Sequence, residues 1–141
     1  MNGVEIKKDI YWVGVKDWNL VEFHGYATPH GSTYNSYLIM DDKITLVDGV
    51  KHYMSDEMIA RVKSDFSKIE YVIVNHVEMD HSGNIPVVMK LAPQAKVVTN
   101  MAGKAALEAH FDTAGWNFEI VKTGDVLNIG KRNLEFMTTP M

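Results

Sequence analysis

The sequence predicts an α/β fold in which helices flank a mixed β-sheet. Short strand-like runs fill the first half of the chain, whereas helical patterns alternate with strand-like runs in the second half. Residues 71–74 form a run that is apolar at every position, which is typical of a strand buried on both faces. Strands followed by alternating helices and strands indicate helices packed against a sheet that contains parallel and antiparallel pairs.

The N-terminal segment predicts short paired strands. Within residues 3–14, a polar break divides two runs that contain spaced apolar residues, so two paired strands fit better than one helix. Residues 20–23 predict a further short strand. Residues 25–33 contain a proline, glycines and small polar residues, and are expected to form a loop.

The clearest hairpin joins residues 36–40 to residues 43–47. Both runs are rich in residues that favour strands, and the pair Asp41-Asp42 between them predicts a tight turn.

The second half predicts three helices between strands. Residues 53–66 place apolar side chains at helical spacing, with acidic residues in the first turn, where the helix dipole favours them. A second helix is expected to start near 84–86 and to end before Pro93. After a strand at 96–99, Asn100 is a suitable N-cap for a helix that reaches about His110. Strands are then expected at 118–121, 126–129 and 134–137.

Composition excludes several classes of protein. The chain has 141 residues, which is the size of one domain or of part of one. It has no cysteine, which excludes disulfides, thiolate metal sites and a cysteine nucleophile. The net charge of −4 argues against a nucleic-acid partner. No apolar run is long enough for a transmembrane helix, and the first residues lack the apolar core of a signal peptide, so a cytoplasmic protein is expected.

Four candidate metal ligands lie within six residues: His76, Glu78, Asp80 and His81. They follow the buried strand directly. In an extended loop, alternate side chains share one side, so the first three are expected to point together and His81 elsewhere. The set divides into two pairs, His76 with Glu78 and Asp80 with His81, which suits two neighbouring metal ions. The alternative is a polar loop whose side chains are solvated or cap the next helix.

This stretch resembles a known motif. His-x-Glu-x-Asp-His is similar to the His-x-His-x-Asp-His motif of the metallo-β-lactamase superfamily, and Glu at its second position, with Ser-Gly following, resembles the flavodiiron proteins. The likeness includes residues 33–39, 45–51, 72–76, 122–125 and 139–141. The resemblance implies a metallo-β-lactamase-like αββα sandwich. Residues 1–141 are expected to be its N-terminal half, with the rest of that domain and a flavodoxin-like domain absent from the chain.

The resemblance also implies an activity. Flavodiiron proteins are cytoplasmic enzymes that reduce O2 to water, NO to N2O, or both, at a non-haem diiron site. Electrons come from rubredoxin or another donor through FMN in the flavodoxin-like domain, and the enzyme is a head-to-tail homodimer. His76 and Glu78 would bind the iron nearer the flavin, and Asp80 and His81 the other iron. The family's further ligands lie downstream of the segment matched by 139–141, so this chain alone is expected to be inactive, with iron absent or replaced by zinc.

Three other residues are candidates for the surroundings of the metals. An aspartate equivalent to Asp48 supports the metal loop in lactamase-like folds, although a residue that ends a strand explains it equally well. Lys51 is a candidate cation near the substrate pocket or a solvated lysine. His24 is a candidate for reaching the diiron pocket, whereas His30 and His52 are expected at the surface.

The sequence is compatible with three functions. The first is the diiron reductase. The second is a lactamase-fold hydrolase that uses a metal-bound hydroxide on an ester or phosphodiester, and Glu78 in place of the usual histidine argues against it. The third is a metal-free structural fragment, which metal content would distinguish from the first.

Overall fold

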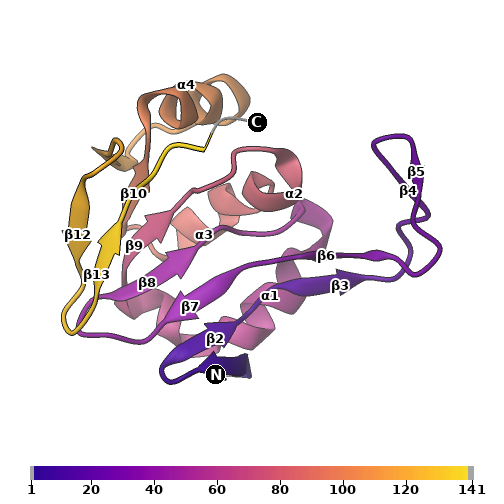
Figure 1. Ribbon diagram of the computed structural model, residues 1–141, viewed down its shortest axis with the longest axis horizontal. Coiled ribbons are helices and arrows are strands. Elements are labelled where there is room, and N and C mark those ends of the chain that lie inside the picture. Colours follow the sequence, from indigo (N-terminus) through magenta and orange to yellow (C-terminus); the bar gives the residue numbers. More distant parts are fainter. Residues whose placement is uncertain (1, 140–141) are drawn as a thin grey trace.

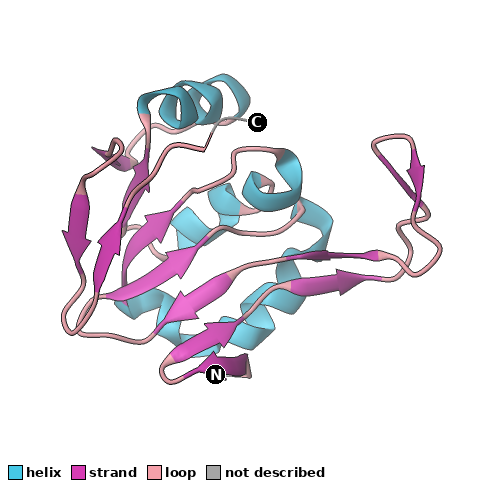
Figure 2. Cartoon of the chain, viewed as in Figure 1, coloured by secondary structure: helices cyan, strands magenta, loops and turns pink. Residues whose placement is uncertain are grey.

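A seven-stranded mixed sheet forms the centre of the computed structural model, which describes residues 2–139 (Figures 1 and 2). Its strand order is β1-β2-β7-β8-β9-β10-β11; the first four strands pair antiparallel, and β8 to β11 are parallel. Pro140 and Met141, part of the segment expected to resemble the family, lie outside the described residues. The strands of this sheet are β1 (Val4–Lys7), β2 (Ile10–Trp12), β7 (Tyr37–Ile39), β8 (Ile44–Val47), β9 (Ile69–Ile73), β10 (Lys96–Thr99) and β11 (Asn117–Ile120).

Helices cover one face of this sheet, and a hairpin of two strands covers part of the other. Met58, Ile85 and Leu107, from three different helices, pack in one core with Leu46 and Val72 of the sheet. The helical segments are η1 (His52–Met54), α1 (Ser55–Val62), η2 (Lys63–Lys68), α2 (Met79–Ser82), α3 (Ile85–Leu91) and α4 (Met101–His110). None of the helices within residues 2–139 is long and apolar enough to cross a membrane.

The opposite face packs against the hairpin of β12 (Val126–Asn128) and β13 (Asn133–Glu135). Tyr71 and Ile73 of β9 join Leu127 and Ile129 in a second apolar cluster, whereas Val72 faces the helices. Strand β9 is therefore buried on both faces, as its apolar sequence predicts.

The structure tests two local predictions, the N-cap of a helix and the hairpin at 36–47. The side chain of Asn100 accepts a hydrogen bond of 2.7 Å from the backbone N–H of Gly103, so it caps α4 as expected. The predicted hairpin at 36–47 is confirmed as the antiparallel pair β7 and β8, but its register pairs Ile39 with Thr45, so the turn is longer than the expected pair Asp41-Asp42.

The segment between β2 and β7 differs from the prediction. The expected loop at 25–33 contains β5 (Tyr26–Ala27) and the start of β6 (Ser32–Tyr34), which pair with β4 (Glu22–Phe23) and β3 (Val15–Asp17). Strand β3 buries Asp17 beside Val15, and this buried carboxylate disguises the alternation of apolar residues that identifies a strand.

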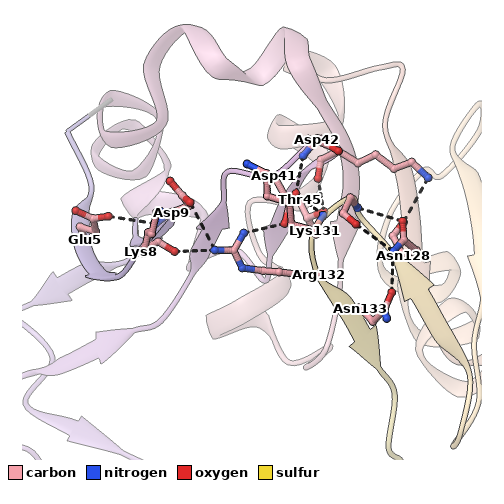
Figure 3. A network of polar contacts seen from close by, with 12 residues as sticks. Glu5, Lys8, Asp9, Asp41, Asp42, Thr45, Asn128, Lys131, Arg132 and Asn133 are labelled. Atoms are coloured by element: carbon pink, nitrogen blue, oxygen red, sulfur yellow. Dashed lines mark hydrogen bonds and ion pairs between the residues drawn. The ribbon is translucent and has the colours of Figure 1, made fainter.

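Asp41 ties the β7–β8 turn to two other turns (Figure 3). Its carboxylate accepts hydrogen bonds from the backbone N–H of Lys131 at 2.9 Å and from the guanidinium of Arg132 at 2.7 Å. Arg132 also donates to the carbonyl of Lys8 between β1 and β2. The Lys131 N–H, followed by Arg132, lowers the pKa of Asp41 from its ordinary value of 3.8 to about 2.

This lowered pKa predicts a pH effect on stability. The ionised form of Asp41 is favoured in the folded chain, so its contribution is present above its unfolded pKa of 3.8 and is lost as the pH falls toward 2. The melting temperature of the native chain should therefore fall more steeply across this interval than that of Asp41→Asn, as measured by thermal unfolding at successive pH values. Asp42→Asn is the matched control, because it removes a charge from the same turn and leaves the Arg132 contact in place. Parallel curves for the native chain and Asp41→Asn would refute the assignment.

Candidate metal centre

The candidate ligands follow β9 at the edge of the sheet where parallel strands end. Asp48 follows β8, which pairs in parallel with β9, so the two strands bring Asp48 and the loop after β9 to the same edge. The carboxyl ends of parallel strands are a common position for binding sites in α/β folds.

Three of the four predicted ligands converge. One ligand atom from each of His76, Glu78 and Asp80 can be chosen so that all three lie within 4.8 Å of one another. The His76 Nε2 and Glu78 Oε2 atoms are 3.7 Å apart. Two ligand atoms about 2.0–2.2 Å from one ion are at most about 4.4 Å apart, so the separation of 3.7 Å between His76 and Glu78 is suited to one metal ion.

His81 lies beside this group. Its Nε2 atom is 3.5 Å from Asp80 Oδ2, and its ring centroid is 5.2 Å from that of His76. The two predicted pairs, His76 with Glu78 and Asp80 with His81, are therefore neighbours in space as well as in sequence.

The backbone that presents these residues differs from the prediction. The expected extended loop ends at Glu78, and α2 begins at Met79, so Asp80 and His81 lie on a single helical turn. The carbonyl of Glu78 accepts hydrogen bonds from the N–H groups of His81 and Ser82, which closes this turn. Asp80 thus converges with His76 and Glu78 through a helical turn, and strand-like alternation does not explain its position.

Asp48 is hydrogen-bonded to the start of the loop that carries the candidate ligands. Its Oδ1 atom accepts hydrogen bonds from the backbone N–H groups of Asn75 at 2.7 Å and His76 at 3.1 Å. Its Oδ2 atom lies 3.9 Å from Nδ1 of His81. Burial raises the pKa of Asp48, against the opposing effect of the two N–H groups and the neighbouring imidazoles. The side chain therefore orients the loop through one oxygen and faces His81 with the other.

Gly49 and Asn84 also support this loop, a role that no sequence pattern predicted. The N–H of Gly49 donates to the carbonyl of His81, and Oδ1 of the buried Asn84 accepts from the N–H of Val50, both at 2.8 Å. A Cβ atom at position 49 would lie 2.1 Å from Asn84 Oδ1, so glycine is required there. Asn84 had a sequence signal, but it indicated only the start of a helix.

The structure brings His24 close to the ligands and Lys51 close to two aromatic rings. His24 Nε2 is 3.8 Å from Glu78 Oε2. The ammonium of Lys51 lies 5.1 Å from the ring centroids of both Phe23 and Tyr34. His30 and His52 are exposed, as expected.

One atom of the cluster lacks, within residues 2–139, the hydrogen-bond partner that buried polar atoms normally have. Nδ1 of His81 is buried and has no hydrogen-bond partner among the described residues. Buried polar atoms are almost always paired, and the carboxylate oxygen that faces this nitrogen, Asp48 Oδ2, is 3.9 Å away, so the imidazole has room to move toward a bound metal ion or toward Asp48. Imidazole and carboxylate ligands without thiolate suit iron, manganese or zinc.

The mixed sheet with its helices, together with this cluster at the ends of parallel strands, defines the metallo-β-lactamase-like class of domain. A family model described as "ODP family beta lactamase" matches residues 33–141. The chain belongs to this family, and the expected flavodiiron resemblance is confirmed at the level of the family and the fold.

Known proteins similar to the chain are considerably longer. A nitric oxide reductase of Moorella thermoacetica is 45% identical over 98% of this chain and 36% of its own length. A rubredoxin-oxygen oxidoreductase of Megalodesulfovibrio gigas is 38% identical over 100% of this chain and 36% of its own. The crystal structure of a flavodiiron protein from Giardia intestinalis superposes with a TM-score of 0.90 and 34% identity, over 96% of this chain and 34% of its own. The chain therefore spans about a third of the length of these relatives.

Proposed function

We propose that this chain supplies part of a non-haem diiron site in an oxidoreductase that reduces NO to N2O, O2 to water, or both. The observation that carries the proposal is the convergence of His76, Glu78 and Asp80 beside His81, with a carboxylate at the second ligand position. Relatives named as a nitric oxide reductase and a rubredoxin-oxygen oxidoreductase support it. They favour a reductase over the hydrolase that the superfamily motif also allows.

Each ligand has a proposed assignment. His76 and Glu78 bind one iron, nearer the flavin, and Asp80 and His81 bind the other. Two adjacent irons can supply two electrons and two neighbouring coordination positions for NO or O2. Asp48 holds the backbone of Asn75 and His76 in position, as residues behind metal ligands commonly do.

His24 and Lys51 are proposed to line the pocket. His24 lies 3.8 Å from Glu78 and can orient this carboxylate by hydrogen bonding through a small movement. The Lys51 ammonium lies 5.1 Å from the ring centroid of Phe23, which precedes His24, and would add a positive charge near the metal site.

The remaining parts of the reaction are proposed to lie outside residues 1–141. These residues would form the N-terminal portion of a metallo-β-lactamase-like domain, and further iron ligands and an FMN-binding flavodoxin-like domain would belong to other parts of the enzyme. Rubredoxin or a similar donor would supply electrons to a head-to-tail homodimer in the cytoplasm. The chain alone is then expected to show no turnover.

A segment exchange tests this proposal. The matching part of the Moorella thermoacetica nitric oxide reductase is replaced by this chain, and consumption of NO and O2 is measured with a reduced donor. The exchanged enzyme should retain turnover, and the same enzyme carrying Glu78→Ala should lose at least about 10-fold in turnover, because substitution of residues behind metal ligands already costs about 10- to 100-fold. An exchanged enzyme that binds FMN normally but turns over equally with and without Glu78→Ala would refute the role of Glu78.

A further inference from the structure

We propose that Lys51 is a positioning residue that anchors the β4–β5 hairpin and thereby holds His24 beside Glu78. This inference deepens the proposed function, because it rests on His24 belonging to the metal pocket. Its evidence is a chain of contacts that runs from a buried polar cluster through Lys51 and Phe23 to His24.

The hairpin has little burial to fix its position. It stands away from the main sheet in Figure 1, and the residues Val21 and Tyr26 are 73% and 75% exposed. The N–H of Thr28 donates to the carbonyl of Val21, so this hydrogen bond stays within the segment. Two-residue turns with positive φ at both positions favour tight hairpins, and His24 and Gly25 have φ values of 51° and 79°. The turn therefore favours the hairpin but does not set its orientation relative to the loop at 76–81. An isolated two-stranded hairpin is only marginally stable in water, so the Val21–Thr28 hydrogen bond should open more often once the hairpin loses its contact with the rest of the chain.

Lys51 supplies a contact between the hairpin and the rest of the chain. Its Nζ atom lies 5.1 Å from the ring centroid of Phe23, 5.1 Å from that of Tyr34 and 5.9 Å from that of Tyr53. These rings come from β4, β6 and η1 respectively. An ammonium group is attracted to aromatic faces at such distances, so one cation joins three elements.

Two of the three rings are held by a polar cluster beneath them. The hydroxyl of the buried Tyr34 donates to Oδ2 of the buried Asp17 at 2.8 Å, and the hydroxyl of Tyr53 donates to the same oxygen. Although burial raises the pKa of Asp17, the two tyrosine hydrogen bonds, the Asn19 N–H and the charge of Lys51 together lower it below the ordinary value. Asp17 is thus an anion that fixes both tyrosines and complements Lys51. Phe23, the third ring around Lys51, belongs to the exposed hairpin.

Phe23 connects this cluster to His24. The two rings are adjacent, with centroids 4.1 Å apart and planes at 66°, and His24 Nε2 is 3.8 Å from Glu78 Oε2. Holding Phe23 against Lys51 therefore limits where the imidazole of His24 can be. Loss of the Lys51 charge should free the hairpin and separate His24 from Glu78.

Amide hydrogen exchange of the metal-free chain tests the inference without any need for activity. In Lys51→Met, which removes the charge and keeps an unbranched side chain, exchange at the Thr28 amide should be roughly 2- to 30-fold faster, the range expected for loss of a cation–π contact. Lys51→Arg should restore protection, because guanidinium groups also bind aromatic faces. Phe23→Leu should match Lys51→Met. Lys104→Met is the control, because it removes a cation 5.4 Å from the Phe118 ring on another part of the chain and should leave the Thr28 amide unchanged.

Two results would overturn the inference. One is unchanged exchange at the hairpin in Lys51→Met. The other is an equal acceleration at the hairpin and at the amides of β9 and β10, which would indicate general destabilisation. The iron content of the exchanged Moorella thermoacetica enzyme separates the two proposals: faster hairpin exchange in Lys51→Met supports the anchor whether or not that enzyme binds iron, and an exchanged enzyme without iron contradicts only the proposed function.

Discussion

Replacing Asp48 with alanine should weaken binding of a divalent metal by about 10- to 100-fold, the range found for residues that orient metal ligands. The reason is geometric. One carboxylate oxygen of Asp48 accepts from both the Asn75 and His76 N–H groups, so its removal frees the backbone that carries His76. Calorimetric titration with Co2+ or anaerobic Fe2+ measures the change.

Two further variants separate the causes of this effect. Asp48→Asn keeps an oxygen that can accept the same hydrogen bonds, so it should lose less affinity than Asp48→Ala. Asp56→Ala removes an acidic residue from the exposed first turn of α1 and should leave metal affinity unchanged. Equal affinities for the native chain and Asp48→Ala would show that this aspartate does not support the metal loop.

Gly49→Ala should lower the free energy of unfolding by about 3 kcal/mol, as overpacking at a tightly enclosed position does. The added Cβ atom would lie 2.1 Å from Asn84 Oδ1 and 2.9 Å from the carbonyl oxygen of His81. Either Asn84 releases the Val50 N–H or the α2 turn moves, so metal affinity should fall together with stability. Denaturant unfolding monitored by circular dichroism gives the first quantity, and Co2+ titration gives the second.

Gly115→Ala is the matched control for this substitution. A Cβ atom at Gly115 meets no atom within 4 Å, although its φ of +84° makes alanine unfavourable. This backbone strain should cost about 1 kcal/mol and leave metal affinity unchanged. If Gly49→Ala unfolds at the same denaturant concentration as Gly115→Ala, or binds metal as tightly as the native chain, the close packing of Gly49 against Asn84 and His81 is not needed.

Sequence patterns predicted the parts of the fold that depend on neighbouring residues. The apolar run at 71–74, the hairpin around Asp41-Asp42 and the Asn100 cap each specify local structure strongly, and each is present, although the turn of the hairpin is longer than two residues. The pair β3 and β6 was missed because a buried charge, Asp17, occupies an inward position that apolar alternation would fill. Its burial becomes understandable only with the hydroxyls of Tyr34 and Tyr53, which are distant in sequence.

The candidate site was predictable in its residues but not in its supports. Four candidate ligands within six residues identified the loop, and Asp48 was recognisable as the end of a neighbouring strand. The spatial roles of Asn84 and Gly49 depend on a contact between segments 34 residues apart in sequence. The aromatic surroundings of Lys51 likewise combine three separate elements, so no local pattern could have indicated them.

Metal binding by residues 76–81 is tested most directly by Co2+ titration of the native chain and of the double variant Glu78→Ala/Asp80→Ala, followed by visible absorption. Cobalt bound by imidazole and carboxylate ligands reports occupancy of this loop, and surface carboxylates give only weak, non-saturating binding. The native chain should show saturable binding that the double variant loses. Saturable binding of the same affinity in both proteins would contradict the assignment of the metal centre to this loop.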